Sequence, residues 1–225
     1  MKSAVIALLL FVPASSIGVT AALFLAPGAI GNGIFTLVKI WLVVLPLFWT
    51  WKTNPEVLRL PRLKKQQILV GIAWGLLMFA AIIAAYWFLG RQSINLTAIR
   101  RKAVEVGITN LNIYLAGFFY WSFINSFIEE CIWRGFVYSQ CAVLMNSLVA
   151  VIFSALFFTL HHSIALYGYT HNWLIVGVGS LGVFLAGVIW SFCYQTSGSI
   201  VPGYISHILA DLAIALIGWQ LLFPV

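Results

Sequence analysis

Long apolar runs, separated by short polar or basic connections, make up most of the chain. A membrane-spanning α-helix needs about 20 consecutive, mostly apolar residues to cross the hydrocarbon layer of a bilayer. The runs here reach that length, and the sequence shows none of the short alternating segments typical of a membrane β-barrel. The pattern therefore predicts an all-α protein, a polytopic transmembrane bundle of about seven helices.

The predicted membrane helices follow one another along the whole chain and form a single integral membrane domain, residues 1–225. They cover approximately residues 4–25, 33–51, 68–90, 114–139, 143–162, 172–195 and 200–222. The fourth helix is expected to break or end near Gln140. Lys39 lies inside the second helix, and we expect it to be close enough to a helix end for its ammonium group to reach the lipid headgroups.

Two polar connections carry most of the positive charge. Residues 52–67 contain five Lys or Arg residues, which indicates a cytoplasmic loop by the positive-inside rule. Residues 91–112 are also basic, although a complete third span would place them on the opposite face of the membrane. A helix at about residues 97–107 that lies on the bilayer surface would resolve this conflict, and the orientation in the membrane stays open.

The composition excludes a soluble domain. The 225 residues are 63% hydrophobic and only 8% charged, whereas about a quarter of the residues in a soluble domain are charged. The formal net charge of +7 could suggest nucleic acid, but no Lys/Arg stripe with interleaved stacking residues lies on a soluble element. We therefore expect the basic loops to meet the lipid bilayer, and we expect no nucleic-acid partner.

The ionisable residues of the C-terminal half gather in three short segments, EECIWR (129–134), FTLHH (158–162) and HILAD (207–211). Each segment alone could be a packing feature: a structural ion pair, an interfacial histidine or a hydrogen bond between helices. The chain as a whole has only five acidic residues. Three such segments in so acid-poor a chain predict one shared polar site within the membrane.

Helix geometry separates the two glutamates of the first segment. A charged side chain at the bilayer centre costs about 2.5–3.5 kcal/mol, so pairing must offset most of this cost. Glu130 and Arg134 are four residues apart and share a helix face, which predicts an ion pair between them. Glu129 points about 100° away and is left free for chemistry.

The histidines allow a similar argument. His207 and Asp211 are four residues apart, so that the carboxylate can orient the imidazole and fix its tautomer. His161 and His162 are adjacent in the sequence. We expect at most one of these two to point directly into a given site.

The order and spacing of these motifs resemble the CPBP intramembrane proteases, which include the CAAX prenyl endopeptidases and bacteriocin-processing and immunity-related homologues. The family pattern EExxxR, FxxxH and HxxxD or HxxxN corresponds here to Glu129, Glu130, Arg134, Phe158, His162, His207 and Asp211. A register one residue earlier would place Phe157 and His161 in the second motif, and we prefer His162. The resemblance covers roughly residues 113–222, which we expect to form the catalytic core.

The resemblance implies a multi-helix bundle with a cavity open toward the membrane. It also implies hydrolysis of a peptide bond by a water molecule that a glutamate and a histidine activate. Carried over to this sequence, Glu129 would be the general base and His162 would bind and polarise the water. Glu130 and Arg134 would brace the site.

The resemblance further implies that His207 and residue 211 stabilise the oxyanion of the tetrahedral intermediate. Some relatives have Asn where this chain has Asp211. An amide donates a hydrogen bond directly, whereas an ionised carboxylate cannot. We therefore expect Asp211 to act by orienting His207 as the donor.

We expect no metal cofactor, because the sequence contains no HExxH pair of histidines on one helix. Zinc is the alternative, since histidines and a carboxylate can form a zinc site with an open position for water. The ligands would then be Glu129, His162 and His207.

The complete motif set favours an intramembrane endopeptidase. Its substrate would be a membrane-associated or small peptide or a membrane protein, and its location the cytoplasmic membrane of a prokaryote. The alternative is a non-catalytic membrane immunity, adaptor or transport protein that uses the same buried polar cluster to bind a peptide or relay protons.

Overall fold

The computed structural model describes residues 1–53 and 64–223. In this part of the chain seven helices are long and apolar enough to cross a membrane. They are Lys2–Leu25, Ala29–Thr53, Lys65–Gly90, Leu111–Leu144, Ser147–Thr170, Trp173–Ser197 and Val201–Leu222. The predicted all-α bundle of about seven membrane helices is confirmed, and the chain is an integral membrane protein. Most of the predicted basic loop at 52–67 lies outside the described residues.

The N-terminal spans are regular apart from short π-helical ends. Helix α1 (Lys2–Thr20) continues as a π-helical turn, Ala21–Leu25, and α3 (Lys65–Ala85) continues as Tyr86–Gly90. Helix α2 runs from Ala29 to Thr53. The helix expected near residues 97–107 is α4 (Leu96–Glu105), and the side chain of Asn95 caps it by accepting a hydrogen bond from the backbone N–H of Ala98.

The fourth span alternates between α-helical and π-helical turns. Its segments are α5 (Leu111–Phe119), a π-helical stretch Tyr120–Asn125, α6 (Ser126–Glu130), a π-helical stretch Cys131–Tyr138 and α7 (Ser139–Leu144). The span ends at Leu144, beyond the expected break near Gln140. Both glutamates of the first motif lie on the short α6, between two π-helical stretches of the kind that often accompany functional sites.

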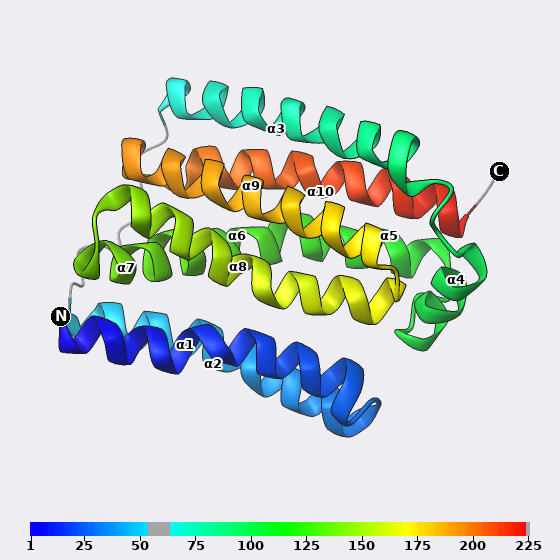
Figure 1. Ribbon diagram of the computed structural model, residues 1–225, viewed down its shortest axis with the longest axis horizontal. Coiled ribbons are helices and arrows are strands. Elements are labelled where there is room, and N and C mark those ends of the chain that lie inside the picture. Colours follow the sequence, from blue (N-terminus) through cyan, green and yellow to red (C-terminus); the bar gives the residue numbers. More distant parts are fainter. Residues whose placement is uncertain (54–63, 224–225) are drawn as a thin grey trace.

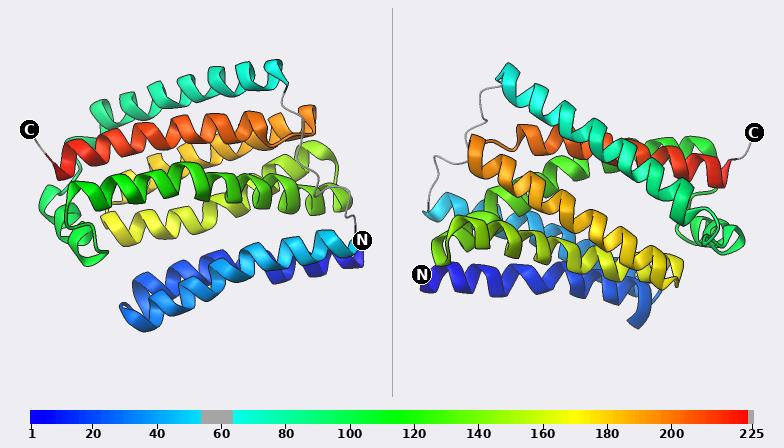
Figure 2. Two further views of the ribbon diagram at one scale, coloured as in Figure 1. Left: turned by 180° about the vertical axis from the view of Figure 1, so that it is seen from behind. Right: turned by 45° about the horizontal axis from the view of Figure 1, so that its top comes forward.

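The helices that carry the three motifs are neighbours in space. Helices α8 (Ser147–Thr170) and α9 (Trp173–Ser197) pack along each other, and α10 (Val201–Leu222) packs along α3 (Figure 1). Helices α1 and α2 form a pair on the side of the bundle away from α3, with α1 against α8. From behind, the fourth span lies between α10 and α2 (Figure 2).

Glycines allow the motif helices to approach closely. A Cβ atom at Gly75 of α3 would clash with Leu209 of α10, and one at Gly187 of α9 would lie 3.1 Å from Cβ of Ala155 in α8. Small residues at such contacts let helix backbones come together where no hydrophobic force drives association in lipid. These close contacts hold α10 against α3 and α8 against α9.

Candidate active site

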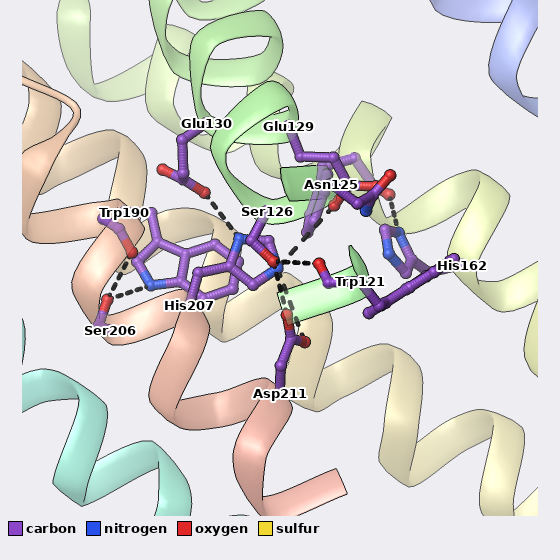
Figure 3. Close-up of polar contacts among 12 residues, drawn as sticks. Trp121, Asn125, Ser126, Glu129, Glu130, His162, Trp190, Ser206, His207 and Asp211 are labelled. Atoms are coloured by element: carbon purple, nitrogen blue, oxygen red, sulfur yellow. Dashed lines mark hydrogen bonds and ion pairs between the residues drawn. The ribbon is translucent and has the colours of Figure 1, made fainter. Parts of the chain in front are cut away.

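The three sequence motifs converge on one buried region of the bundle (Figure 3). We call it the polar cluster, and it comprises Glu129, Glu130, Arg134, His161, His162, His207 and Asp211. The residues come from the fourth span, α8 and α10. All the predicted site residues therefore lie together, although the sequence separates the first and last motifs by most of the C-terminal half.

Glu130 and Arg134 form the predicted ion pair. Nη1 of Arg134 lies 2.9 Å from Oε1 of Glu130, and the two side chains are 1% and 0% exposed. The contact is an ion pair rather than a well-aligned hydrogen bond. The guanidinium carbon also lies 4.6 Å from the ring centroid of Phe158 and 4.8 Å from that of Trp190, within the range of a cation–π contact. These contacts hold Arg134 and Glu130 in place.

Glu130 also fixes the orientation of His207. Nδ1 of His207 lies 3.1 Å from Oε1 of Glu130, and an ionised carboxylate can only accept, so Nδ1 donates. The imidazole stacks on Trp190 with ring centroids 4.1 Å apart. Nε2 is then left facing two further carboxylates, 3.9 Å from Oε2 of Glu129 and 4.0 Å from Oδ1 of Asp211.

The expected orientation of His207 by Asp211 is wrong. The separation of 4.0 Å between Nε2 and Oδ1 exceeds a hydrogen-bond distance. Instead, Oδ2 of Asp211 accepts a hydrogen bond of 2.6 Å from Oγ of Ser126 on the fourth span. Helix spacing places His207 and Asp211 on one face, but a donor from another helix determines which way the carboxylate points.

Glu129 faces the two histidines of α8. One possible ligand atom from each of Glu129, His161 and His162 lies within 4.8 Å of the others. Nδ1 of His162 donates to the carbonyl of Phe158 at 2.8 Å, as a carbonyl oxygen can only accept, which leaves Nε2 as the free nitrogen. His161 stacks on Trp133, with ring centroids 5.3 Å apart. Both adjacent histidines thus approach Glu129, contrary to the expectation that only one would.

Residues 111–213 match the family model described as Type II CAAX prenyl endopeptidase Rce1-like. This segment is similar to that family, and we call residues 111–213 the CPBP segment because the match agrees with the resemblance to the CPBP proteases. The resemblance is confirmed, and it supports a membrane protease that acts on peptides. A comparison with curated proteins and one with solved structures gave no match.

The CPBP segment contains every predicted site residue from Glu129 to Asp211 and leaves α1 to α4 outside. The boundaries of the expected catalytic core, 113–222, stay a prediction. The expected cavity that opens toward the membrane also stays a prediction. A cavity of about 350 Å³ lies beside Lys64, Gln67 and Pro202, and none of its described lining residues belongs to the polar cluster.

The side chains of the CPBP segment present a set of atoms that zinc accepts. Glu129, His161 and His162 offer one carboxylate oxygen and two imidazole nitrogens within 4.8 Å, and zinc binds such a set with a fourth position open. The zinc ligands considered from the sequence included His207, and the set found here has His161 in its place. The residues fit a metal, and the expectation of a metal-free site stays a prediction.

Several polar-cluster neighbours were not predicted as site residues. Ser126 and Asn125 each lie four residues before a glutamate and therefore share its helix face, a spacing that could have revealed them. Trp190, which donates from Nε1 to Oγ of Ser206 at 2.6 Å, has no such signal. Lys39 was expected near the headgroups, but its Nζ donates to Oδ1 of Asn125 at 2.9 Å.

Proposed function

We propose that this protein is an intramembrane endopeptidase of the CPBP type in which Glu129 acts as the general base toward water. The observation that carries the proposal is the contrast between adjacent glutamates. Glu130 is held by Arg134 at 2.9 Å and by His207 at 3.1 Å. The ion pair that Glu129 forms among the described residues is longer, with Nε2 of His207 at 3.9 Å. Glu129 is therefore the carboxylate left to accept a proton.

In the proposed reaction Glu129 and His162 orient the attacking water. With Nδ1 bound to the carbonyl of Phe158, Nε2 of His162 accepts one water hydrogen while Glu129 accepts the other. The oxygen lone pair then points at the scissile carbonyl carbon. Glu129 takes the proton as the C–O bond forms and returns it to the leaving amine as the C–N bond breaks, the usual double duty of a general base.

His207 is the proposed donor to the oxyanion. Its Nδ1–H is committed to Glu130, so it donates from Nε2 only as the doubly protonated imidazolium. Asp211 does not set the tautomer in this scheme. With Ser126 holding its other oxygen at 2.6 Å, it places a negative charge 4.0 Å from Nε2 and serves as a charge partner for that imidazolium.

If zinc binds, Glu129, His161 and His162 would hold it, and the metal would supply a Lewis acid that lowers the pKa of bound water. The roles of Glu130, Arg134 and His207 in bracing and donating are the same in either case.

The substrate we propose is a small peptide or a membrane protein that reaches the site from the bilayer, in the cytoplasmic membrane of a prokaryote. The family name refers to CAAX prenyl endopeptidases, and cleavage of a lipid-modified peptide is one form of this substrate class. The non-catalytic alternative gains no support, because a peptide-binding cluster has no need of a carboxylate kept apart from the arginine.

The test is cleavage of a membrane-peptide library by purified protein in lipid discs, read by mass spectrometry. Wild type is compared with Glu129→Gln and with a control, Glu105→Gln, whose glutamate pairs with Lys102 at 3.2 Å on the exposed α4. We expect wild type and control to cleave the same peptides and Glu129→Gln to cleave none. Cleavage by Glu129→Gln at the wild-type rate would contradict the proposal.

A further inference from the structure

Lys39 is a positive charge within the bundle, on a helix outside the CPBP segment. It lies well inside α2, which runs from Ala29 to Thr53, about 15 Å from the nearer end at 1.5 Å per residue. A lysine side chain is too short to bring its ammonium group past that end. Because a charge at this depth is unfavourable unless it is paired, its position calls for a partner.

Within the described residues, no direct contact neutralises the charge of Lys39, although the Glu129 carboxylate attracts it from beyond ion-pair distance. Nζ donates to Oδ1 of Asn125 at 2.9 Å and lies 5.6 Å and 5.8 Å from the ring centroids of Phe35 and Trp121. Cation–π contacts of this kind attract the ammonium group but leave its full charge in place. No ion pair joins Lys39 to a carboxylate among residues 1–53 and 64–223.

Asn125 provides an independent sign of a missing ligand. Its side chain is 2% exposed, and Nδ2 has no hydrogen-bond acceptor in the part of the chain that the structure describes. Since Oδ1 of the same amide contacts the ammonium group, Nδ2 lies beside it. An ammonium group has three N–H donors, and Asn125 accepts from one of them. Within residues 1–53 and 64–223, the other two donors and the amide N–H of Asn125 have no acceptor.

A carboxylate is the ligand that matches this set. It offers two oxygens that only accept, and charge-assisted hydrogen bonds to it are about twice as strong as neutral ones. Asn125 precedes Glu129 by one helical turn, so the donors lie about 5–6 Å along the helix from the proposed general base. An extended peptide covers 3.3–3.6 Å per residue, which places the bound carboxylate about one or two residues from the bond under attack.

We propose that Lys39 and Asn125 bind a carboxylate of the peptide substrate and thereby set which bond is presented to Glu129. The carboxylate is either the free C-terminus or an Asp or Glu side chain near the cleaved bond. This inference rests on the proposed protease function for its consequence, but the binding itself needs no hydrolysis.

The binding test uses three lipophilic probes in lipid discs: N-dodecanoyl-leucine, with a terminal carboxylate; N-dodecanoyl-glutamic acid α-amide, with a side-chain carboxylate alone; and N-dodecanoyl-leucinamide, with none. We expect wild type to bind at least one carboxylate probe about tenfold or more tightly than the amide, and the preferred probe identifies the source of the carboxylate. Equal dissociation constants for all three probes, or no binding of any, would overturn the inference.

Variants assign the preference to the two residues. Lys39→Met is expected to abolish it, and Asn125→Asp is expected to do the same by placing a carboxylate on the ammonium group. Lys52→Met, at the exposed end of the same helix, should retain it. Size-exclusion profiles and thermal midpoints in lipid establish folding, and Asn125→Asp serves if Lys39→Met does not fold. Retention of the preference in a folded Lys39→Met or Asn125→Asp would contradict the inference.

Failure of this inference differs visibly from failure of the protease proposal. The binding preference should persist in Glu129→Gln, which does not cleave. Cleavage by wild type that ignores carboxylates would overturn the role of Lys39 and leave the protease intact. A carboxylate preference in a protein that cleaves nothing would support the binding site and count against the protease.

Discussion

The two sides of the polar cluster differ in how their charges are held. On the Glu130 side the carboxylate meets Arg134 and His207 at 2.9 and 3.1 Å and is fully buried. On the Glu129 side, the ion pair found among the described residues is longer, with Nε2 of His207 at 3.9 Å. His162 on this side is held by a hydrogen bond from its Nδ1 to the backbone carbonyl of Phe158. Of the two adjacent glutamates, Glu130 therefore stabilises the site, and Glu129 keeps its carboxylate oxygens available as acceptors.

The largest expected effect comes from removing the charge on the Glu130 side. Arg134→Met leaves Glu130 buried without its ion-pair partner, which should lower the free energy of unfolding by about 3–5 kcal/mol. Arg101→Met is the matched control, since Arg101 pairs with Glu105 at 3.8 Å on an exposed face. This control should change the free energy of unfolding by no more than about 0.5 kcal/mol. Reversible unfolding in lipid measures both, and equal effects would break the comparison.

A steric change at Gly203 should act on the same side. A Cβ atom there would collide with Oε2 of Glu130, so Gly203→Ala should displace the carboxylate and lower the free energy of unfolding by about 1–3 kcal/mol. Gly182→Ala, with open space around its added Cβ, should be neutral or slightly stabilising because alanine favours a helix by up to about 1 kcal/mol. A neutral Gly203→Ala variant would show that Glu130 is not tightly held.

The hydrogen bond to Asp211 gives a smaller test. Ser126→Ala removes the 2.6 Å donor to Oδ2 and should lower the free energy of unfolding by about 1–3 kcal/mol, together with the cleavage rate. Thr36→Ala on α2, which loses an exposed bond to the carbonyl of Asn32, is the control. A Ser126→Ala variant with full activity would mean that the position of Asp211 does not matter to the reaction.

Removal of metal should have the smallest effect. The metal-free mechanism predicts that a strong chelator leaves the cleavage rate unchanged and that elemental analysis finds less than stoichiometric zinc. Loss of cleavage that zinc restores would instead assign Glu129, His161 and His162 as ligands, and His161→Ala should then lower the zinc content.

Local spacing explains what could be read from the sequence. The Glu130–Arg134 pair lies within one helical turn, and apolar runs set the membrane helices, so both followed from periodicity. The partner of His207 did not, because Glu130 and His207 are 77 residues apart and their meeting depends on how α10 packs against the fourth span. The hydrogen bond between Lys39 and Asn125, which are 86 residues apart, could not be predicted for the same reason.

The most direct test of the division between the glutamates is a paired measurement on Glu129→Gln and Glu130→Gln in lipid, with cleavage and unfolding followed on the same samples. Our account predicts that Glu129→Gln loses about 10²–10⁴-fold in cleavage rate, the usual contribution of a general base, with its free energy of unfolding changed by within about 1 kcal/mol. Glu130→Gln should lose both activity and stability. Comparable destabilisation by the two changes, or cleavage by Glu129→Gln at the wild-type rate, would contradict it.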